Sequence, residues 1–89
     1  MAWRIEFDAE ASKEFRKLDH TAQRAIAKYF RERIATDEDP CRFGRTLRGE
    51  KTGLWRYRVA DYRLICRIEA ERLVVVVLVV GHRRNVYDR

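Results

Sequence analysis

The sequence predicts an α+β fold in which an N-terminal strand and a helical hairpin pack on one face of an antiparallel sheet. Three observations lead to this class. The first residues alternate apolar and charged side chains, as a half-buried strand does, and the next segments repeat apolar residues at helical spacing. The second half holds three strand-like segments with very short joins, which is typical of an antiparallel meander. With 89 residues the chain is long enough for one domain, so we expect a single domain over residues 1–89.

The first predicted elements are a strand and a short helix. Trp3, Ile5 and Phe7 alternate with charged residues, which is the period of a strand with one buried face. Asp8 follows where a helix N-cap belongs, because its carboxylate can accept from free backbone N–H groups. Apolar residues then recur at helical spacing over residues 11–18 and predict the helix.

A second helix is expected next, capped by either Asp19 or Thr21. Its apolar stripe consists of Ala22, Ile26, Tyr29, Phe30 and Ile34. Only a few residues separate the two helices, so we expect them to form an antiparallel hairpin. Residues 36–44 break the helical pattern with an acidic run, a proline and a glycine, and they predict a loop.

Three strands are predicted after this loop, over residues 54–59, 62–69 and 72–80. Each join is only two residues long, which favours tight hairpins. The last strand is apolar at every position from residue 73 onward, so it has no face suited to water. We therefore expect it to lie in the centre of the sheet, with both faces covered over most of its length.

The charge is unevenly distributed. The net charge is +6, and residues 1–44 hold 9 basic and 9 acidic residues, whereas residues 45–89 hold 11 basic and 5 acidic ones. A basic half of a small domain favours a polyanionic partner, such as nucleic acid or an acidic protein segment. The alternative is a charge excess that only aids solubility.

Several classes of protein are excluded. The N-terminal residues lack the pattern of a signal peptide, and the apolar run of residues 73–80 is far shorter than the roughly 20 residues that span a bilayer. We therefore expect a cytoplasmic protein without membrane contacts. Cys41 and Cys66 are far apart in sequence, which favours two reduced thiols over a disulfide. The two Cys and two His residues never come within ligand spacing, so we expect no metal site.

Four arginines are expected on one face of the sheet. Strand alternation puts Arg56 and Arg58 opposite the aromatic face of residues 54–59, and Arg63 and Arg67 can join them from the next strand. Arginine binds phosphate with a planar fork, so the cluster suits a phosphate chain, whereas a solvated sheet face is the alternative interpretation. The tyrosines that could offer stacking surfaces for bases are Tyr57, Tyr62 and Tyr87.

Four motifs in this order resemble the RelE family of bacterial toxin–antitoxin systems. They are "LRG" at 47–49, "WRYR" at 55–58, "DYRLICRI" at 61–68 and "GHRRNVY" at 81–87. Together with the strand and the helical hairpin before them, they extend the similarity over nearly the whole chain. The resemblance implies a RelE-like toxin domain with a microbial-ribonuclease-like fold.

The resemblance also implies an activity and partners. A RelE-like chain is expected to be the toxin of a type II toxin–antitoxin system and a ribosome-dependent mRNA endoribonuclease. It would cleave codons in the ribosomal A site by transesterification through the 2′-hydroxyl, inhibit translation and use no cofactor or metal. The implied partners are a cognate RelB-like antitoxin and the mRNA in the A site beside 16S rRNA, with operator DNA as a candidate partner of the toxin–antitoxin complex.

The family's site positions fall on particular residues of this chain. The resemblance implies catalytic roles for Arg58, Arg63, Arg83 and Tyr87. Arg58 and Arg63 would stabilise the charge that develops on the phosphate, and Arg83 would orient that phosphate or stabilise the leaving oxygen. Tyr87 would stack on a base or deprotonate the 2′-hydroxyl. The residues expected to contact RNA are Arg48, Arg56, Arg67, His82 and Arg84.

Two departures from the family leave alternatives open. The best-known member of the family carries lysines where this chain has Arg56 and Arg58. It also has two more residues between its counterparts of Arg83 and Tyr87. An arginine side chain keeps its proton at neutral pH and therefore cannot accept one as a general base. His82 is consequently an alternative group for proton transfer. The chain could also be a ParE-like toxin that acts on DNA gyrase without nuclease activity, or an RNA-binding module that does not cleave.

Overall fold

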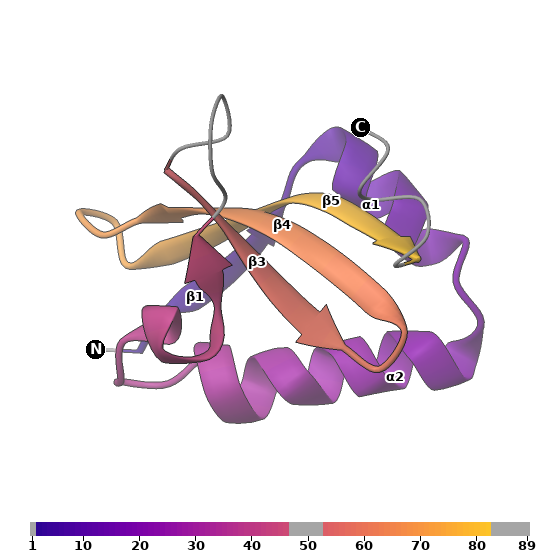
Figure 1. Cartoon of the computed structure of the whole chain (residues 1–89), viewed down its shortest axis with the longest axis horizontal. Helices are drawn as coiled ribbons and strands as arrows, with labels where there is room; N and C mark the ends of the chain where they lie inside the picture. The colour runs from indigo at the N-terminus through magenta and orange to yellow at the C-terminus, as the bar shows by residue number, and fades with distance from the viewer. Residues whose placement is uncertain (1, 47–52, 83–89) are drawn as a thin grey trace.

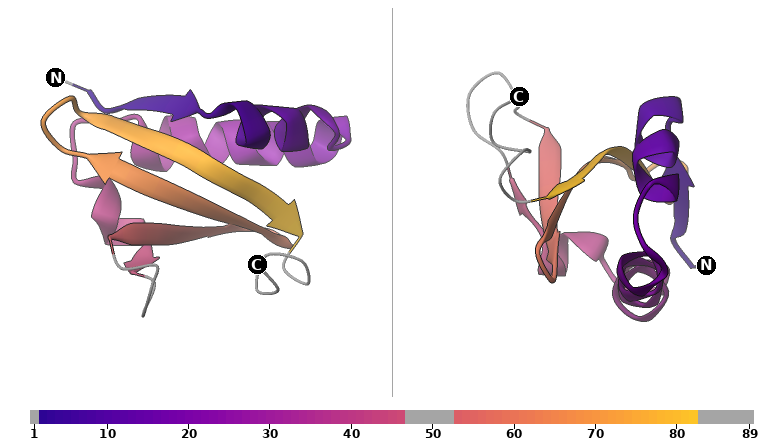
Figure 2. Two further views of the ribbon diagram at one scale, coloured as in Figure 1. Left: turned by 90° about the horizontal axis from the view of Figure 1, so that it is seen from above. Right: turned by 90° about the vertical axis from the view of Figure 1, so that its right-hand side faces the viewer.

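A computed structural model of the chain describes residues 2–46 and 53–82. The elements in chain order are β1 Arg4–Phe7, α1 Ala9–Arg16, α2 His20–Tyr29, the π-helical turn η1 Phe30–Ile34, the 3-10 helix η2 Pro40–Phe43, β2 Arg45–Thr46, β3 Leu54–Val59, β4 Tyr62–Glu69 and β5 Val74–His82. The strands form one twisted layer, and α1 and α2 lie along one side of it (Figures 1 and 2). Within the described ranges, no helix is long and apolar enough to cross a membrane.

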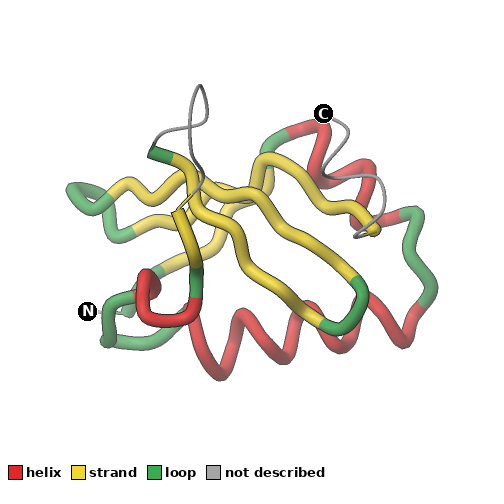
Figure 3. Tube along the Cα trace, in the orientation of Figure 1, coloured by secondary structure: helices red, strands yellow, loops and turns green. Residues whose placement is uncertain are grey.

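The sheet has five strands in the order β1-β5-β4-β3-β2 (Figure 3). Strands β2 to β5 pair with one another in antiparallel fashion, whereas β1 runs parallel to β5 with Ile5 beside Val75. The predicted α+β class, with helices on one face and a three-strand meander, is confirmed. The sheet is mixed, however, because two helices lie between β1 and the meander, so β1 is free to enter the sheet in the same direction as β5. Period-two alternation reveals a strand's faces but not the direction of its neighbours.

Aspartates cap both helices of the hairpin. The carboxylate of Asp8 accepts a hydrogen bond of 2.8 Å from the backbone N–H of Ala11, as predicted. Asp19, not Thr21, caps α2, since its carboxylate accepts from the N–H of Ala22 at 2.8 Å. Both caps satisfy donors that the first turn of a helix leaves without partners.

Gln23 closes the hairpin, and the sequence did not indicate it. Its side-chain Nε2 donates to the backbone oxygens of Phe15 at 3.1 Å and Leu18 at 3.2 Å. These carbonyls lie at the end of α1 and just beyond it, where intrahelical partners run out. A single amide from α2 therefore fixes how α2 follows α1.

The core lies between the helices and the sheet. Ile26, Phe30 and Ile34 are buried, as the predicted apolar stripe requires. The sheet residues in the same cluster are Tyr57, Val59, Leu64, Cys66, Val75, Val77 and Val80. Burial of this cluster holds the helical hairpin against one face of the sheet, and within residues 2–46 and 53–82 α1 and α2 do not cover the opposite face of β3 and β4.

Strand β5 lies inside the sheet between β1 and β4, as an interior strand should, although the middle position predicted for it belongs to β4. Residues 74–77 are buried, so both faces of its first half are covered. Its bounds differ by two residues at each end from the predicted 72–80. Leu73 has a φ of 54° and belongs to the preceding turn, while pairing continues to His82.

A bulge interrupts β5 halfway along. Cys66 pairs with Val77 and Ile65 with Val79, so Leu78 is an extra residue in the β5 strand. A bulge shifts the alternation of side chains between the two faces. As a result Val80, like Val77, belongs to the core cluster.

The predicted loop over residues 36–44 holds the 3-10 helix η2, with Asp39 accepting from the N–H of Cys41 at 2.9 Å. The two-residue strand β2 follows it and pairs with β3 at the edge of the sheet. Neither was predicted, because elements this short carry no periodic pattern.

Candidate functional site

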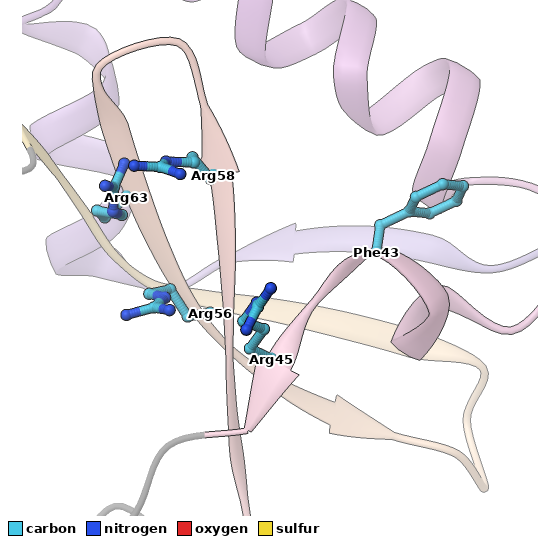
Figure 4. A pocket seen from close by; sticks show the side chains of 5 residues that line it. All are labelled: Phe43, Arg45, Arg56, Arg58 and Arg63. Atoms are coloured by element: carbon cyan, nitrogen blue, oxygen red, sulfur yellow. The ribbon is translucent and has the colours of Figure 1, made fainter.

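A cavity of about 180 Å³ lies against the sheet face that the helices leave open. It is lined by Phe43, Arg45, Arg56, Arg58 and Arg63 (Figure 4). None of these described lining residues is acidic. The sheet therefore supports a pocket with a concentrated positive charge.

The register of the strands explains why these arginines meet. Arg58 pairs directly with Arg63 across the β3–β4 hairpin, and Arg45 pairs directly with Arg56 across β2 and β3. Directly paired residues point to the same face, and alternation puts Arg56 and Arg58 on one face of β3. Two arginine pairs thus stand side by side on one face of the sheet.

The first pair combines an exposed side chain with a buried one. Arg58 is exposed, whereas Arg63 is only 5% exposed. Their guanidinium groups point toward each other in Figure 4. The partner of Arg63 on its other side is Gly81, which has no side chain. The surrounding residues therefore restrict the side chain of Arg63, whereas the neighbouring side chain of Arg58 is exposed to solvent.

Like charges directly opposite each other in a sheet lower its stability, by a few tenths to about 1 kcal/mol per pair. An anion between the guanidinium groups removes this repulsion and accepts hydrogen bonds from both. Because arginines are rigid and strongly basic donors, such a cavity is suited to a phosphate or another oxyanion. The geometry thus indicates an anion-binding site.

Arg67 was expected in this cluster, but it does not line the cavity. Its guanidinium forms an ion pair of 2.9 Å with Glu69, which also pairs at 2.7 Å with Arg72. Arg72 in turn reaches Glu6 on β1 at 3.2 Å. Hydrogen bonds from Arg72 and Arg67 lower the pKa of Glu69. This network lies beside buried Val76, on the part of the face away from the cavity.

His82 lies on the other face of the sheet. It pairs with Tyr62, and the two rings meet edge to face with centroids 5.9 Å apart. Arg63 is the next residue after Tyr62 and points to the opposite face. The structure therefore does not bring His82 to the arginine cavity.

The end of β5 is also fixed from the helical side. The backbone N–H of Val80 donates to the carboxylate of Glu14 on α1 at 3.0 Å. Val80 is the residue before Gly81, the partner of Arg63. A carboxylate from the helical hairpin thus holds the strand segment that lies beside the arginine pair.

Tyr57 does not serve as a stacking surface. It is fully buried in the core, and its hydroxyl donates to the backbone oxygen of Pro40 at 2.8 Å. Burial, more than the neighbouring thiols and Tyr29, raises the pKa of Tyr57. Tyr57 thus stabilises the segment before β2 rather than facing the cavity.

The cavity has no group suited to proton transfer among its described residues. Its lining consists of four arginines, which stay protonated, and Phe43. Cys41 lies two residues before Phe43, and burial together with Asp39 raises the pKa of its thiol to about 11. It is therefore a neutral thiol at physiological pH. The described residues can bind and polarise an anion, but they do not supply a base.

Four of the residues expected at the site lie outside the described residues. They are Arg48, Arg83, Arg84 and Tyr87. Conversely, the sequence did not indicate Arg45 and Phe43 as residues of the site. Arg45 follows directly on the segment read as a loop, and only its pairing with Arg56 brings it to the cavity.

Known proteins resemble this chain in sequence and in fold. Residues 5–87 match the profile of a family described as the ParE toxin of type II toxin-antitoxin system, parDE. The toxin RelG of Mycobacterium tuberculosis is 32% identical over 89 residues, which is 100% of both chains. A chain of the RelBE2 toxin-antitoxin complex from the same organism superposes with a TM-score of 0.83 at 30% identity, covering 93% of this chain and 100% of that one. A chain of the intact E. coli RelBE complex gives a TM-score of 0.72 at 29% identity, covering 91% and 96%.

Proposed function

Since the chain belongs to the ParE toxin family of type II toxin–antitoxin systems, within the RelE/ParE superfamily, we propose that it is a ribosome-dependent mRNA endoribonuclease. The observation that carries this proposal is the arginine cavity. Four arginines face one pocket with no acidic residue among its described lining. A protein that acts only by binding another protein does not require several guanidinium groups around one cavity that suits a phosphate.

The proposed reaction is transesterification at an RNA phosphate. The ribose 2′-oxygen forms a bond to phosphorus, and the bond from phosphorus to the 5′-oxygen breaks. The 2′-hydroxyl loses its proton, the leaving 5′-oxygen gains one, and the product ends in a 2′,3′-cyclic phosphate. Arg58 and Arg63 would donate to the nonbridging oxygens, where negative charge grows as the reaction proceeds.

The composition of the cavity supports the proposed dependence on the ribosome. Its described residues can stabilise charge, but none is a base at neutral pH. Such a site accelerates the reaction only when the 2′-hydroxyl is already held in line with the bond that breaks. We propose that the ribosome supplies this orientation by holding the message in the A site.

Two further roles rest on the resemblance of the C-terminal motif to the RelE family. Arg83 would orient the phosphate or stabilise the leaving oxygen, and Tyr87 would stack on a base or take the 2′-hydroxyl proton. Arg48 and Arg84 would contact the RNA backbone. These assignments are proposals from the sequence, since all four residues lie outside the described part of the chain.

We also propose a RelB-like antitoxin as the partner that inhibits the toxin. The M. tuberculosis and E. coli relatives were each crystallised as complexes of a toxin with its antitoxin. An acidic segment of such a partner would neutralise the exposed arginines. We therefore propose that the antitoxin covers the arginine cavity.

Primer extension on a model message in programmed ribosomes tests the proposed function. The parent chain should produce cuts at A-site codons, and the Arg58→Gln variant should cut 10²- to 10³-fold more slowly because one charge-stabilising donor is gone. Arg24→Gln is the matched control, since Arg24 is exposed on α2, in the helical layer on the other side of the sheet. Absence of cuts with folded parent protein, or equal loss in both variants, would contradict the proposal.

The second candidate is a toxin that inhibits DNA gyrase by binding it. The description of the matching family, which refers to parDE, favours this alternative. A gyrase supercoiling assay distinguishes the two. Inhibition of supercoiling by a chain that cuts no message would replace the nuclease by the gyrase ligand.

A further inference from the structure

We propose that Arg45 and Arg56 form a second phosphate subsite, one nucleotide away from the phosphate bound by Arg58 and Arg63. This inference deepens the proposed nuclease function and rests on it for the identity of the ligand. It assigns to Arg45 a role in binding RNA that its position after a loop does not indicate. The site would thus bind two successive phosphates of a single RNA strand.

The arrangement of the pairs carries the inference. Arg45 and Arg56 are directly paired across β2 and β3, just as Arg58 and Arg63 are paired across β3 and β4. All four side chains line the same cavity (Figure 4). The cavity is therefore lined by two directly paired sets of arginines, although only Arg58 and Arg63 point their guanidinium groups toward each other in Figure 4.

The spacing of the pairs suits a nucleotide chain. Arg56 and Arg58 are two residues apart on β3, which puts their Cα atoms roughly 7 Å apart. This separation is close to one sugar–phosphate repeat of an extended single strand. A strand of RNA that runs parallel to β3 over this face would therefore present one phosphate to each pair.

Both pairs place like charges directly opposite each other, and a single phosphate would offset the repulsion within only one pair. Arg45 opposite Arg56 repels as Arg58 opposite Arg63 does. Arg42 on η2, for comparison, is paired with the carboxylate of Glu38. The cavity instead gathers arginines with no acidic group among its described lining residues. Two bound phosphates would stabilise both pairs.

Phe43 lines the cavity but is not assigned to the subsite. It lines the cavity through its position just before β2, but its ring lies away from the arginines in Figure 4. The guanidinium carbon of Arg42 lies 4.6 Å and that of Arg33 5.2 Å from the ring centroid. The ring is thus occupied by two cations of its own, so we assign no base to it and restrict the subsite to phosphate.

Short probes that cannot be cleaved test the second subsite without the ribosome. The full chain is titrated with a 2′-O-methyl dinucleoside monophosphate, which has one phosphate, and with the matching trinucleoside diphosphate, which has two. The parent should bind the second probe roughly tenfold more tightly or better, as expected for an added hydrogen-bonded ion pair. NMR shifts of backbone amides in β2 and β3 report the binding.

Variants at Arg45 show whether this side chain causes the tighter binding of the probe with two phosphates. Arg45→Gln should bind both probes alike, whereas Arg24→Gln, which removes the same charge from the helical side, should keep the gain from the second phosphate. Arg45→Lys keeps the charge but loses the planar fork, so it should keep only part of the gain and serves if the Gln variant does not fold. An equal gain in parent and Arg45→Gln, or no gain in the parent, overturns the second subsite.

The result also separates this inference from the proposed function. Cutting on ribosomes without any gain from the second phosphate would remove the subsite and leave the nuclease. A gain that depends on Arg45 in a chain that cuts no message would keep the subsite and remove the nuclease. A lower salt dependence of binding in Arg45→Gln, by about 0.7 in the logarithmic slope, would support one lost phosphate contact.

Discussion

Arg58 and Arg63 face each other directly across the β3–β4 hairpin, near the turn at Ala60 and Asp61. Their repulsion lowers stability, and in the proposed function their proximity would provide a phosphate with two donors. Function and stability therefore have opposite requirements at this pair.

Replacing Arg58 by Gln should separate the two requirements. We expect the free energy of unfolding to rise by a few tenths to about 1 kcal/mol, because the like-charge pair is removed. The same change should slow message cleavage strongly. Urea unfolding at low and high salt measures the first effect, which should shrink at high salt as screening increases. A variant that is less stable than the parent at low salt would contradict the interpretation of the pair.

Replacing Arg67 by Gln should have a much smaller effect on cleavage, less than about threefold, although the sequence grouped Arg67 with the other arginines. Its guanidinium is paired with Glu69 away from the cavity. The pair is exposed, so the loss should change stability by less than about 1 kcal/mol. Cleavage rates of Arg67→Gln and Arg58→Gln on the same programmed ribosomes provide the comparison. Equal losses would place Arg67 on the RNA path.

Stability should fall at alkaline pH because of Tyr57. Burial raises its pKa in the folded state, so the folded chain favours the neutral phenol. The stabilisation is complete below the unfolded pKa of about 10 and is lost as the pH rises above that value. Tyr57→Phe should therefore weaken the fall in stability above about pH 10. At neutral pH it should cost about 1 kcal/mol, since the hydrogen bond to the Pro40 oxygen is lost.

Unfolding by urea at several pH values measures this difference. Tyr62→Phe is the matched control, because Tyr62 lies on the same face of the sheet but is only half buried. A parallel loss of stability with pH in the parent and in Tyr57→Phe would show that other groups, such as the buried thiol of Cys66, cause the fall. Burial also raises the pKa of Cys66, so its contribution has the same sign.

Gly44→Ala should destabilise the fold. A Cβ at this position would lie 3.0 Å from two ring atoms of Tyr57 and 3.3 Å from the backbone oxygen of Arg56. The Tyr57 ring is fully buried and tied to Pro40, so it has little room to move. We expect a cost of roughly 1–3 kcal/mol, the usual range for overpacking. Thermal unfolding measures it, and a melting temperature equal to that of the parent would refute the close contact.

Ala60→Gly should stabilise the hairpin that joins the two arginine strands. Ala60 has a φ of 52°, a left-handed conformation that costs an L-residue about 1–2 kcal/mol. Glycine removes this cost but loses about 0.5–1 kcal/mol of chain entropy on folding, so the net gain should be up to about 1.5 kcal/mol. Urea unfolding measures the gain. Cleavage should not change, because the register of Arg58 with Arg63 is kept.

Much of the fold was predictable because its signals are local. Period-two and helical patterns predict β1, β3, β4 and the two helices, and the position of Asp8 alone predicts its role as a cap. The joins of the meander predicted the hairpin at Ala60. The parallel pairing of β1 with β5 and the strand β2 could not be predicted, since both depend on contacts between distant segments.

The candidate site was predictable only in part, for the same reason. Alternation placed Arg56, Arg58 and Arg63 on one face, and the register confirmed that they line one cavity. Alternation also suggested Arg67, because pairing with Glu69 cannot be seen from a period. Arg45 was missed, since only a strand of two residues brings it opposite Arg56.

The bond from Val80 to Glu14 has a consequence for how the sheet assembles. All eight residues from 73 to 80 are valine or leucine, so β5 could slide along β4 by two residues and still place apolar side chains on both faces. Packing alone therefore discriminates weakly between the native alignment and its slipped copies. Only the native alignment brings the N–H of Val80 to the carboxylate of Glu14 and puts Gly81 beside Arg63. A carboxylate on the first helix thus selects one alignment among several of nearly equal packing energy, and it does so before any ligand is present.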